Sequence, residues 1–268
     1  SSTYAVQQRR GPGEMRVGVG STVAAVMAAS GGGSVGQYGP LVHFGATMTE
    51  VLLKYVRIKI DRRVFIACGV AGAISAGFNA PIAGVLFAYE ALLRRISVGA
   101  IAPIAVASIV AYAANQAFFN LEPMLAVPDM SIELRPLIPF LIFTGVLSAL
   151  TSVAYMAAIR KGRELASRSG WSMPQLLVSC VVVVGSISVV VPDVAGLGLT
   201  QINEIIDAKF GLAMLFVLLA GKIFVTAYCL NTGFFGGVFG PALFVGAATG
   251  AIVANVAILA GLAPHLSY

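Results

Sequence analysis

The chain alternates apolar stretches with short polar loops, and this pattern predicts a protein built of helices. The stretches that we expect to be helical span residues 17–29, 40–56, 64–77, 81–90, 101–118, 136–158, 173–191, 210–230 and 241–262. The longer ones reach the ~20 residues that a helix needs to cross a bilayer. The stretches 64–77 and 81–90 are each too short to cross alone, so we expect a bent or re-entrant pair that breaks at residues 78–81.

The composition excludes an ordinary soluble domain. Of the 268 residues, 58% are hydrophobic and 10% are charged, whereas about 25% of an average soluble domain is charged. We therefore expect an integral membrane protein; the location we expect for it is the bacterial inner (plasma) membrane, which the composition itself does not specify. The net charge of +6 lies in the loops, where it indicates orientation and contact with anionic lipid rather than nucleic acid.

The charged loops predict how the chain is oriented. Basic side chains gather in three segments, 54–63, 94–95 and 160–168. Such loops stay on the cytoplasmic side of a membrane, so the mostly acidic loop 119–135 is expected on the outside. Helices 101–118 and 136–158 then cross in opposite directions.

Two segments share the motif Gly-x-(Tyr/Phe)-Gly-Pro-x-x-x-x-Gly. They span residues 36–45 and 237–246, and each follows a glycine-rich run. Proline fits the first turn of a helix, so we expect helices to begin at Pro40 and Pro241. In a membrane the positive end of such a helix has to be buried in protein or line a cavity, where it can bind an anion.

The recurrence of this motif in an apolar chain predicts an internal repeat with a site shared by its halves. We expect a first repeat over residues 1–135 and a second over residues 136–268. The two repeats are expected to form one transmembrane domain.

Three motifs in this order resemble those of the CLC chloride channels and proton/chloride antiporters. Residues 36–40 resemble the second glycine-rich signature of that family, and residues 236–241 resemble its Gly-Gly-x-Phe-x-Pro signature. Residues 78–87 with Glu90 are similar to the segment between the two. The resemblance implies an all-α polytopic membrane protein with a CLC-type inverted repeat, broken and re-entrant helices, and a homodimeric assembly.

The resemblance also implies an anion site made of main-chain groups. The N–H groups of Gln37, Tyr38 and Gly39 would face the anion from one half, and those of Val238 and Phe239 from the other. Backbone amides can hold an anion without placing a full charge in lipid. Chloride or a similar small anion and membrane lipid are therefore the expected partners, with no cofactor and no metal.

Two positions depart from the pattern of the family. Tyr38 stands where a gating glutamate is usual, and Ala91 stands where antiporters often have a second glutamate. Because tyrosine has a pKa near ~10 and alanine does not titrate, we expect anion movement that is not coupled to protons. Tyr38 would plug the outer pore or donate its O–H to the anion; the alternative is an aromatic side chain that packs at a helix start.

Further signatures of the family would lie outside this chain. Its first signature, with a coordinating serine, would fall before Ser1, and its late helix, with a coordinating tyrosine, would fall after Tyr268. We therefore expect the chain to be part of a longer protein.

Several polar residues in apolar stretches have competing interpretations. For His43, hydrogen bonding in the core is favoured over a proton relay. For Glu90, a surface pair with Arg94 is favoured over a proton path. Lys222 either neutralises a cluster of carbonyl groups or raises the potential that attracts anions, and the sequence leaves both open.

Other residues are expected to have structural roles. Asn79 is predicted to cap a helix, and Asn231 and Thr232 are predicted to cap the carbonyl groups at a helix end. The cysteines expected to be small buried hydrophobic residues are Cys68, Cys180 and Cys229.

The best interpretation is a CLC-type chloride channel or uncoupled anion uniporter. An enzyme is not expected, because the sequence shows no metal-ligand cluster, nucleophile–base set or phosphate loop. One alternative keeps the fold and couples chloride or fluoride to protons. Two others are a cation-coupled transporter, which would favour carboxylates at the midplane, and a non-conducting membrane subunit that Tyr38 keeps closed.

Overall fold

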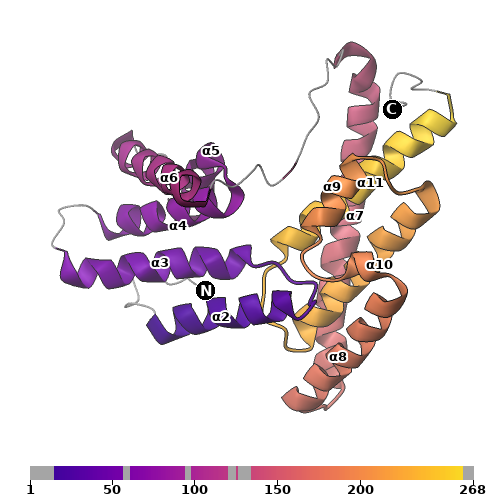
Figure 1. The fold of residues 1–268 in the computed structure, drawn as a ribbon, viewed down its shortest axis with the longest axis horizontal. Coiled ribbons are helices and arrows are strands. Elements are labelled where there is room, and N and C mark those ends of the chain that lie inside the picture. The colour runs from indigo at the N-terminus through magenta and orange to yellow at the C-terminus, as the bar shows by residue number, and fades with distance from the viewer. Residues whose placement is uncertain (1–14, 57–60, 94–97, 120–124, 126–133, 262–268) are drawn as a thin grey trace. The chain divides into compact units, whose positions relative to one another are not determined.

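The computed structural model describes residues 15–56, 61–93, 98–119, 125 and 134–261, and the regular elements in these residues are helices (Figure 1). They are α2 (Met15–Ser30), α3 (Tyr38–Tyr55), α4 (Arg62–Phe78), α5 (Pro81–Phe87), the π-helical segment η1 (Ala88–Leu93), α6 (Val98–Phe119), α7 (Leu134–Arg168), α8 (Met173–Val190), the 3₁₀ turn η2 (Pro192–Val194), α9 (Leu199–Ile206), α10 (Leu212–Asn231) and α11 (Phe239–Leu259). The predicted all-α fold is confirmed.

Within the described part of the chain, five helical segments are long and apolar enough to cross a membrane. They are Val98–Phe119, Ile138–Arg168, Met173–Val190, Leu212–Asn231 and Phe239–Leu259. Their outer faces carry large apolar side chains, such as Val110 and Val182, each 60% exposed. A helix that is apolar on its outward side as well as its packed side is suited to lipid, and the protein is an integral membrane protein.

Both helices that carry the repeated motif begin two residues earlier than predicted. The first residue of α3 is Tyr38 and that of α11 is Phe239, so the expected starts at Pro40 and Pro241 are wrong. The first N–H groups of a helix have no partner within it. Proline therefore fits the third position of a helix as well as the first, and the motif alone does not fix the helix start.

The described residues of the segments 1–26 and 37–124 form one compact unit. In it α4 packs against α3, α5 and α6. A Cβ atom on Gly45 would lie 2.6 Å from the carbonyl oxygen of Gly69. Glycine at this crossing therefore allows α3 and α4 to approach closely, as small residues do between membrane helices.

The break between α4 and α5 is built by Asn79. This residue adopts the left-handed conformation (φ 54°) and its N–H donates to the carbonyl of Ser75, so it caps the C-terminal end of α4. Asparagine tolerates this conformation better than most residues. The hydroxyl groups of Ser75 and Ser108 then join the pieces, since Ser75 donates to Ser108 O and Ser108 donates to Pro81 O, each at 2.7 Å.

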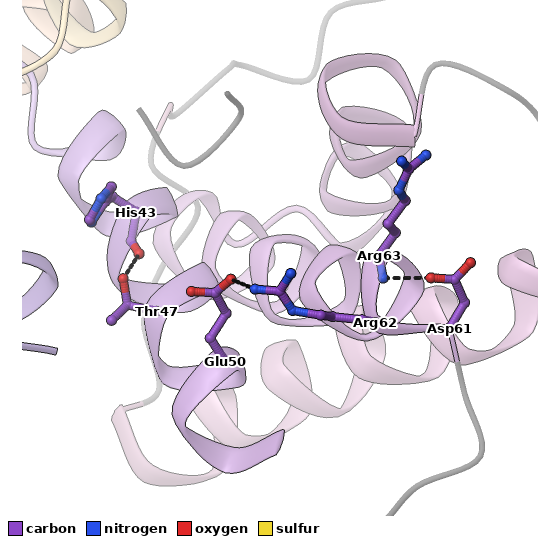
Figure 2. A network of polar contacts seen from close by, with 6 residues as sticks. All are labelled: His43, Thr47, Glu50, Asp61, Arg62 and Arg63. Atoms are coloured by element: carbon purple, nitrogen blue, oxygen red, sulfur yellow. Dashed lines mark hydrogen bonds and ion pairs between the residues drawn. The ribbon is translucent and has the colours of Figure 1, made fainter. Parts of the chain in front are cut away.

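An ion pair joins the end of α3 to the start of α4 (Figure 2). The Nη2 atom of Arg62 donates to Oε1 of Glu50 at 2.6 Å, and the two side chains are 41% and 8% exposed. Next to it, the carboxylate of Asp61 accepts a hydrogen bond from the N–H of Arg63 at 2.9 Å and caps α4. The buried carboxylate therefore depends on an arginine that water partly screens.

Glu50→Ala is expected to destabilise the protein by roughly 1–3 kcal/mol, because it removes a charged hydrogen bond from a mostly buried site. The value stays below that of a fully buried pair because Arg62 is partly exposed. The measurement is the thermal unfolding midpoint in detergent at a fixed scan rate. Arg63→Ala is the matched control, since Arg63 is the exposed neighbour and should leave the midpoint unchanged; equal shifts would contradict the assignment.

The described residues of the segments 27–36 and 125–268 form the second compact unit. In it α10 packs against α7, α8 and α11. Its core contains Val35 and Phe244, both fully buried, so the glycine-rich run before α3 belongs to this unit. The division into repeats over 1–135 and 136–268 stays a prediction.

The C-terminal end of α10 is capped as predicted. Asn231 donates through Nδ2 to the carbonyl of Ala227 at 2.7 Å, and Thr232 donates through Oγ1 to that of Tyr228 at 2.7 Å. The expectation of buried cysteines is met by Cys180 and Cys229, which are fully buried free thiols with Sγ atoms 3.9 Å apart, but not fully by Cys68, a free thiol that is only partly buried.

Candidate anion-binding site

The start of α11 is held by a pair of glycines. Within the second unit, Gly36 N–H donates to Gly237 O at 2.6 Å and Gly237 N–H donates to Gly36 O at 2.5 Å. A Cβ atom on Gly36 would lie 3.0 Å from both Gly237 O and Gly240 N. A side chain at residue 36 would press on these backbone atoms, so glycine favours the close main-chain pairing of Gly36 with Gly237.

The glycine-rich run that ends at Gly36 has further partners in the second unit. Gly196 N–H donates to Gly32 O at 2.9 Å. The hydroxyl groups of Ser34 and Thr226 lie 2.8 Å apart, and both side chains are fully buried. The run is therefore held by hydrogen bonds from α10 and from the loop before α9.

Lys222 is fully buried in the second unit and is surrounded by carbonyl groups. Its Nζ atom donates to Gly196 O at 2.8 Å, to Val194 O at 3.1 Å and to Ala195 O at 3.5 Å, and lies 4.8 Å from the centroid of the Phe244 ring. A buried cation needs such partners to offset its lost hydration. The interpretation as a neutraliser of carbonyl groups matches these contacts, and a role in attracting anions stays a prediction.

A buried tyrosine contacts the residue that precedes α11. The hydroxyl of Tyr155, on α7, donates to Val238 O at 3.1 Å, and the side chain of Thr226 interacts with Tyr155. Neither Tyr155 nor Thr226 was predicted from the sequence. One available signal was the spacing of Thr226, which follows Lys222 by one helical turn in an otherwise apolar helix.

Residues 37–45 of the first motif lie in the other unit, and the tyrosine among them is packed. Tyr38 is 3% exposed, and its ring stacks on that of Phe78 with 3.9 Å between centroids. The side chain of Gln37 hydrogen-bonds the Tyr38 hydroxyl. These contacts match the aromatic-packing interpretation, while the gating role of Tyr38 and the anion contacts of Gln37, Tyr38 and Gly39 stay predictions.

His43 lies on α3, one turn before Thr47. Thr47 Oγ1 donates to the His43 carbonyl at 2.8 Å, but the imidazole Nδ1 is buried without a hydrogen-bond partner among the described residues. The expected core hydrogen bond is therefore not seen at this atom. Figure 2 shows the Glu50 carboxylate turned toward Arg62 and the imidazole turned away from it.

Two further predictions concern Glu90 and possible metal ligands. Glu90 lies in η1, and Arg94, its expected partner, is outside the described residues. The described residues contain no group of three or more His, Cys, Asp or Glu side chains that could hold a metal ion. The anion contacts of Val238 and Phe239 at the start of α11 stay predictions.

Comparison with known proteins identifies relatives over nearly the whole chain. Residues 3–267 match the family described as Voltage gated chloride channel. The chain is 29% identical over 230 residues to the H(+)/Cl(-) exchange transporter ClcA of Vibrio campbellii, and the match covers 82% of this chain and 49% of the relative. It is 26% identical over 264 residues to the Chloride channel protein CLC-f of Arabidopsis thaliana, with 91% and 34% covered.

A solved structure is similar to this chain in fold. The crystal structure of a CLC-type fluoride/proton antiporter matches with a TM-score of 0.75 and 21% identity, over 97% of this chain and 65% of that chain. The likeness confirms the CLC-type arrangement of helices. The chain spans about half the length of the relative from Vibrio campbellii, and about a third of the plant relative.

Proposed function

Because the chain belongs to the voltage gated chloride channel family, we propose that it forms the anion-conducting core of a chloride channel or uncoupled anion uniporter. The protein would work as a homodimer in the bacterial inner membrane and carry chloride or a similar small anion. The observation that carries this proposal is the position of Tyr38, which replaces a titratable carboxylate by a packed phenol.

The proposed anion ligands are main-chain N–H groups at the two helix starts. They are those of Gln37, Tyr38, Gly39, Val238 and Phe239. Helix starts carry a partial positive charge and orient their N–H groups toward an anion. Support comes from the pairing of Gly36 with Gly237, since these two residues directly precede the two sets of ligands in the sequence.

The absence of proton coupling follows from the side chains at the two positions of the family pattern. Tyr38 keeps its proton at neutral pH, because a phenol has a pKa near ~10, and its hydroxyl is hydrogen-bonded to Gln37. Ala91 cannot carry a proton. An anion would therefore pass without a compulsory proton step.

A second candidate is a chloride or fluoride antiporter that exchanges the anion for protons. It is favoured by the names of the relatives, since ClcA is an H(+)/Cl(-) exchange transporter and the solved structure is of a fluoride/proton antiporter. Such a protein would need a titratable group other than residues 38 and 91. His43 is the group in the described part that has a buried nitrogen without a partner.

The experiment is anion efflux from liposomes that hold the full-length protein, with chloride and external pH recorded together. Wild type is expected to release chloride without a linked pH change. Tyr38→Ala is expected to speed efflux roughly two- to tenfold, the rate equivalent of the ~0.5–1.5 kcal/mol that an aromatic pair such as Tyr38–Phe78 contributes. Tyr55→Ala, an exposed tyrosine at the other end of α3, is the control.

Each outcome separates the candidates. Proton movement in fixed ratio to chloride would reject the uncoupled uniporter and favour the antiporter, with His43→Gln as the next variant. Absence of flux from wild type and from Tyr38→Ala would favour a non-conducting subunit.

A further inference from the structure

A chain of buried hydroxyl groups crosses the second unit behind the start of α11. The hydroxyl oxygens of Ser34 and Thr226 lie 2.8 Å apart, the Thr226 side chain interacts with Tyr155, and the Tyr155 hydroxyl donates to Val238 O at 3.1 Å. Ser34 and Thr226 are fully buried and Tyr155 is 5% exposed. The chain thus joins the run before the first motif to the first residue of the proposed second anion ligand set.

The direction of the hydrogen bond to Val238 follows from proton counting. A carbonyl oxygen can only accept, so Tyr155 donates its single proton to Val238 O. Between Ser34 and Thr226, whose hydroxyl oxygens lie 2.8 Å apart, either group can be the donor.

The hydrogen bond from Tyr155 to Val238 O also fixes the direction of the Phe239 N–H group. The carbonyl of Val238 and the N–H of Phe239 belong to one planar, trans peptide unit. A hydrogen bond that fixes the direction of the carbonyl therefore fixes the opposite direction of the N–H. The same carbonyl also accepts from Ala242 N–H at 3.0 Å, so the peptide plane has two anchors, one from its own helix and one from α7.

The preceding peptide unit is fixed in the same way. Gly237 O accepts from Gly36 N–H at 2.6 Å, and this carbonyl shares its plane with the N–H of Val238. The two N–H groups proposed to hold the anion from this side therefore each lie in a peptide unit whose carbonyl has an outside donor. One donor is a glycine backbone and the other is the Tyr155 hydroxyl.

We propose that Tyr155 is a positioning residue of the anion site, which orients the Phe239 N–H by holding the Val238 carbonyl. This inference rests on the proposed function. The hydroxyl of Tyr155 is engaged with the Val238 carbonyl, and its side chain is 5% exposed. Thr226 and Ser34 support it as neighbouring buried hydroxyl groups, hydrogen-bonded to each other at 2.8 Å.

The test is Tyr155→Phe in the full-length protein, which removes the hydroxyl and keeps the ring. The apparent chloride affinity, taken from the concentration dependence of efflux and from calorimetric titration, is expected to fall roughly three- to tenfold, the loss that one hydrogen bond corresponds to. Tyr228→Phe is the matched control, because its hydroxyl bonds Ser179 Oγ at 3.2 Å rather than the residue before α11, and its affinity should stay at the wild-type value.

Variants of Thr226 and the preference among anions separate a positioning role of Tyr155 from a contribution to stability alone. Thr226→Ser keeps a hydroxyl and should retain wild-type chloride affinity. The double variant Thr226→Val with Tyr155→Phe should lose less affinity than the sum of the two single losses, because the two side chains act as a unit. The preference for chloride over the larger nitrate should fall in Tyr155→Phe. A purely structural hydroxyl would lower the thermal midpoint and leave affinity and preference unchanged.

The failure of this inference differs from the failure of the proposed function. Wild type that binds and moves chloride, together with a Tyr155→Phe variant of equal affinity, would overturn only the role of Tyr155. Wild type that neither binds nor moves chloride would overturn the proposed function and this inference with it. If Tyr155→Phe does not fold, the Thr226→Val variant decides, because it weakens the same hydroxyl without touching the ring.

Discussion

Gly36→Ala is expected to slow chloride efflux roughly 5- to 150-fold, although it adds one methyl group. The new Cβ atom would lie 3.0 Å from Gly237 O and 3.0 Å from Gly240 N. Both are backbone atoms, so a side-chain rotation cannot make room. Separating the two segments costs about 1–3 kcal/mol by analogy with overpacking, and ~1.4 kcal/mol corresponds to a tenfold change in rate.

Gly36→Ala is expected to affect transport more than folding, because it shifts the peptide unit that joins Gly237 to Val238. Its carbonyl accepts from Gly36 N–H, and a shift of that carbonyl rotates the N–H of Val238. The measurement is the initial rate of chloride efflux from liposomes at equal protein content. Gly185→Ala on α8 is the control, because a Cβ atom there meets nothing within 4 Å; a similar loss in this control would contradict a specific role of Gly36.

Lys222→Met is expected to lower stability by roughly 2–4 kcal/mol. The change leaves three carbonyl groups without their donor, and each unsatisfied buried group costs about 1–3 kcal/mol. The loss is smaller than the sum because removing the cation also removes the cost of burying its charge. The measurement is the thermal unfolding midpoint of the detergent-solubilised protein.

The same variant separates the two roles that the sequence leaves open for Lys222. If the lysine serves the loop before α9, the midpoint falls and the folded fraction keeps its apparent chloride affinity, which is the result we expect. If the lysine attracts anions, affinity falls at an unchanged midpoint. Lys209→Met is the control, because Lys209 is exposed beside Asp207 and should change neither quantity.

The helices of this fold were predictable because a membrane helix has to be apolar over most of its length. The break at Asn79 was also predictable, since Asn-Ala-Pro interrupts an apolar run. The exact starts of α3 and α11 were not. Proline tolerates several positions in the first turn, so the neighbouring residues and their tertiary partners decide which residue begins the helix.

The candidate site was predictable only where glycine and proline residues mark it in the sequence. Glycine and proline mark a helix start, and so residues 36–40 and 237–241 could be singled out from the sequence. The partners of Lys222 could not, because they are main-chain carbonyls of an irregular loop, and every residue has a carbonyl. Tyr155 was missed for a related reason: its contact with Val238 spans 83 residues, and a tyrosine in an apolar helix can equally face lipid headgroups or pack against another ring.

The contact between Ser34 and Thr226 also has a consequence for how the chain is made. The two residues are 192 positions apart, so at the usual rate of synthesis Ser34 emerges about 10–40 s before its partner. Polar backbone cannot stay unpaired in lipid during that time. The backbone groups of the glycine-rich run therefore have to be hydrogen-bonded to water or to a temporary protein partner. The run can dock in its final position only after α10 and the start of α11 have been synthesised.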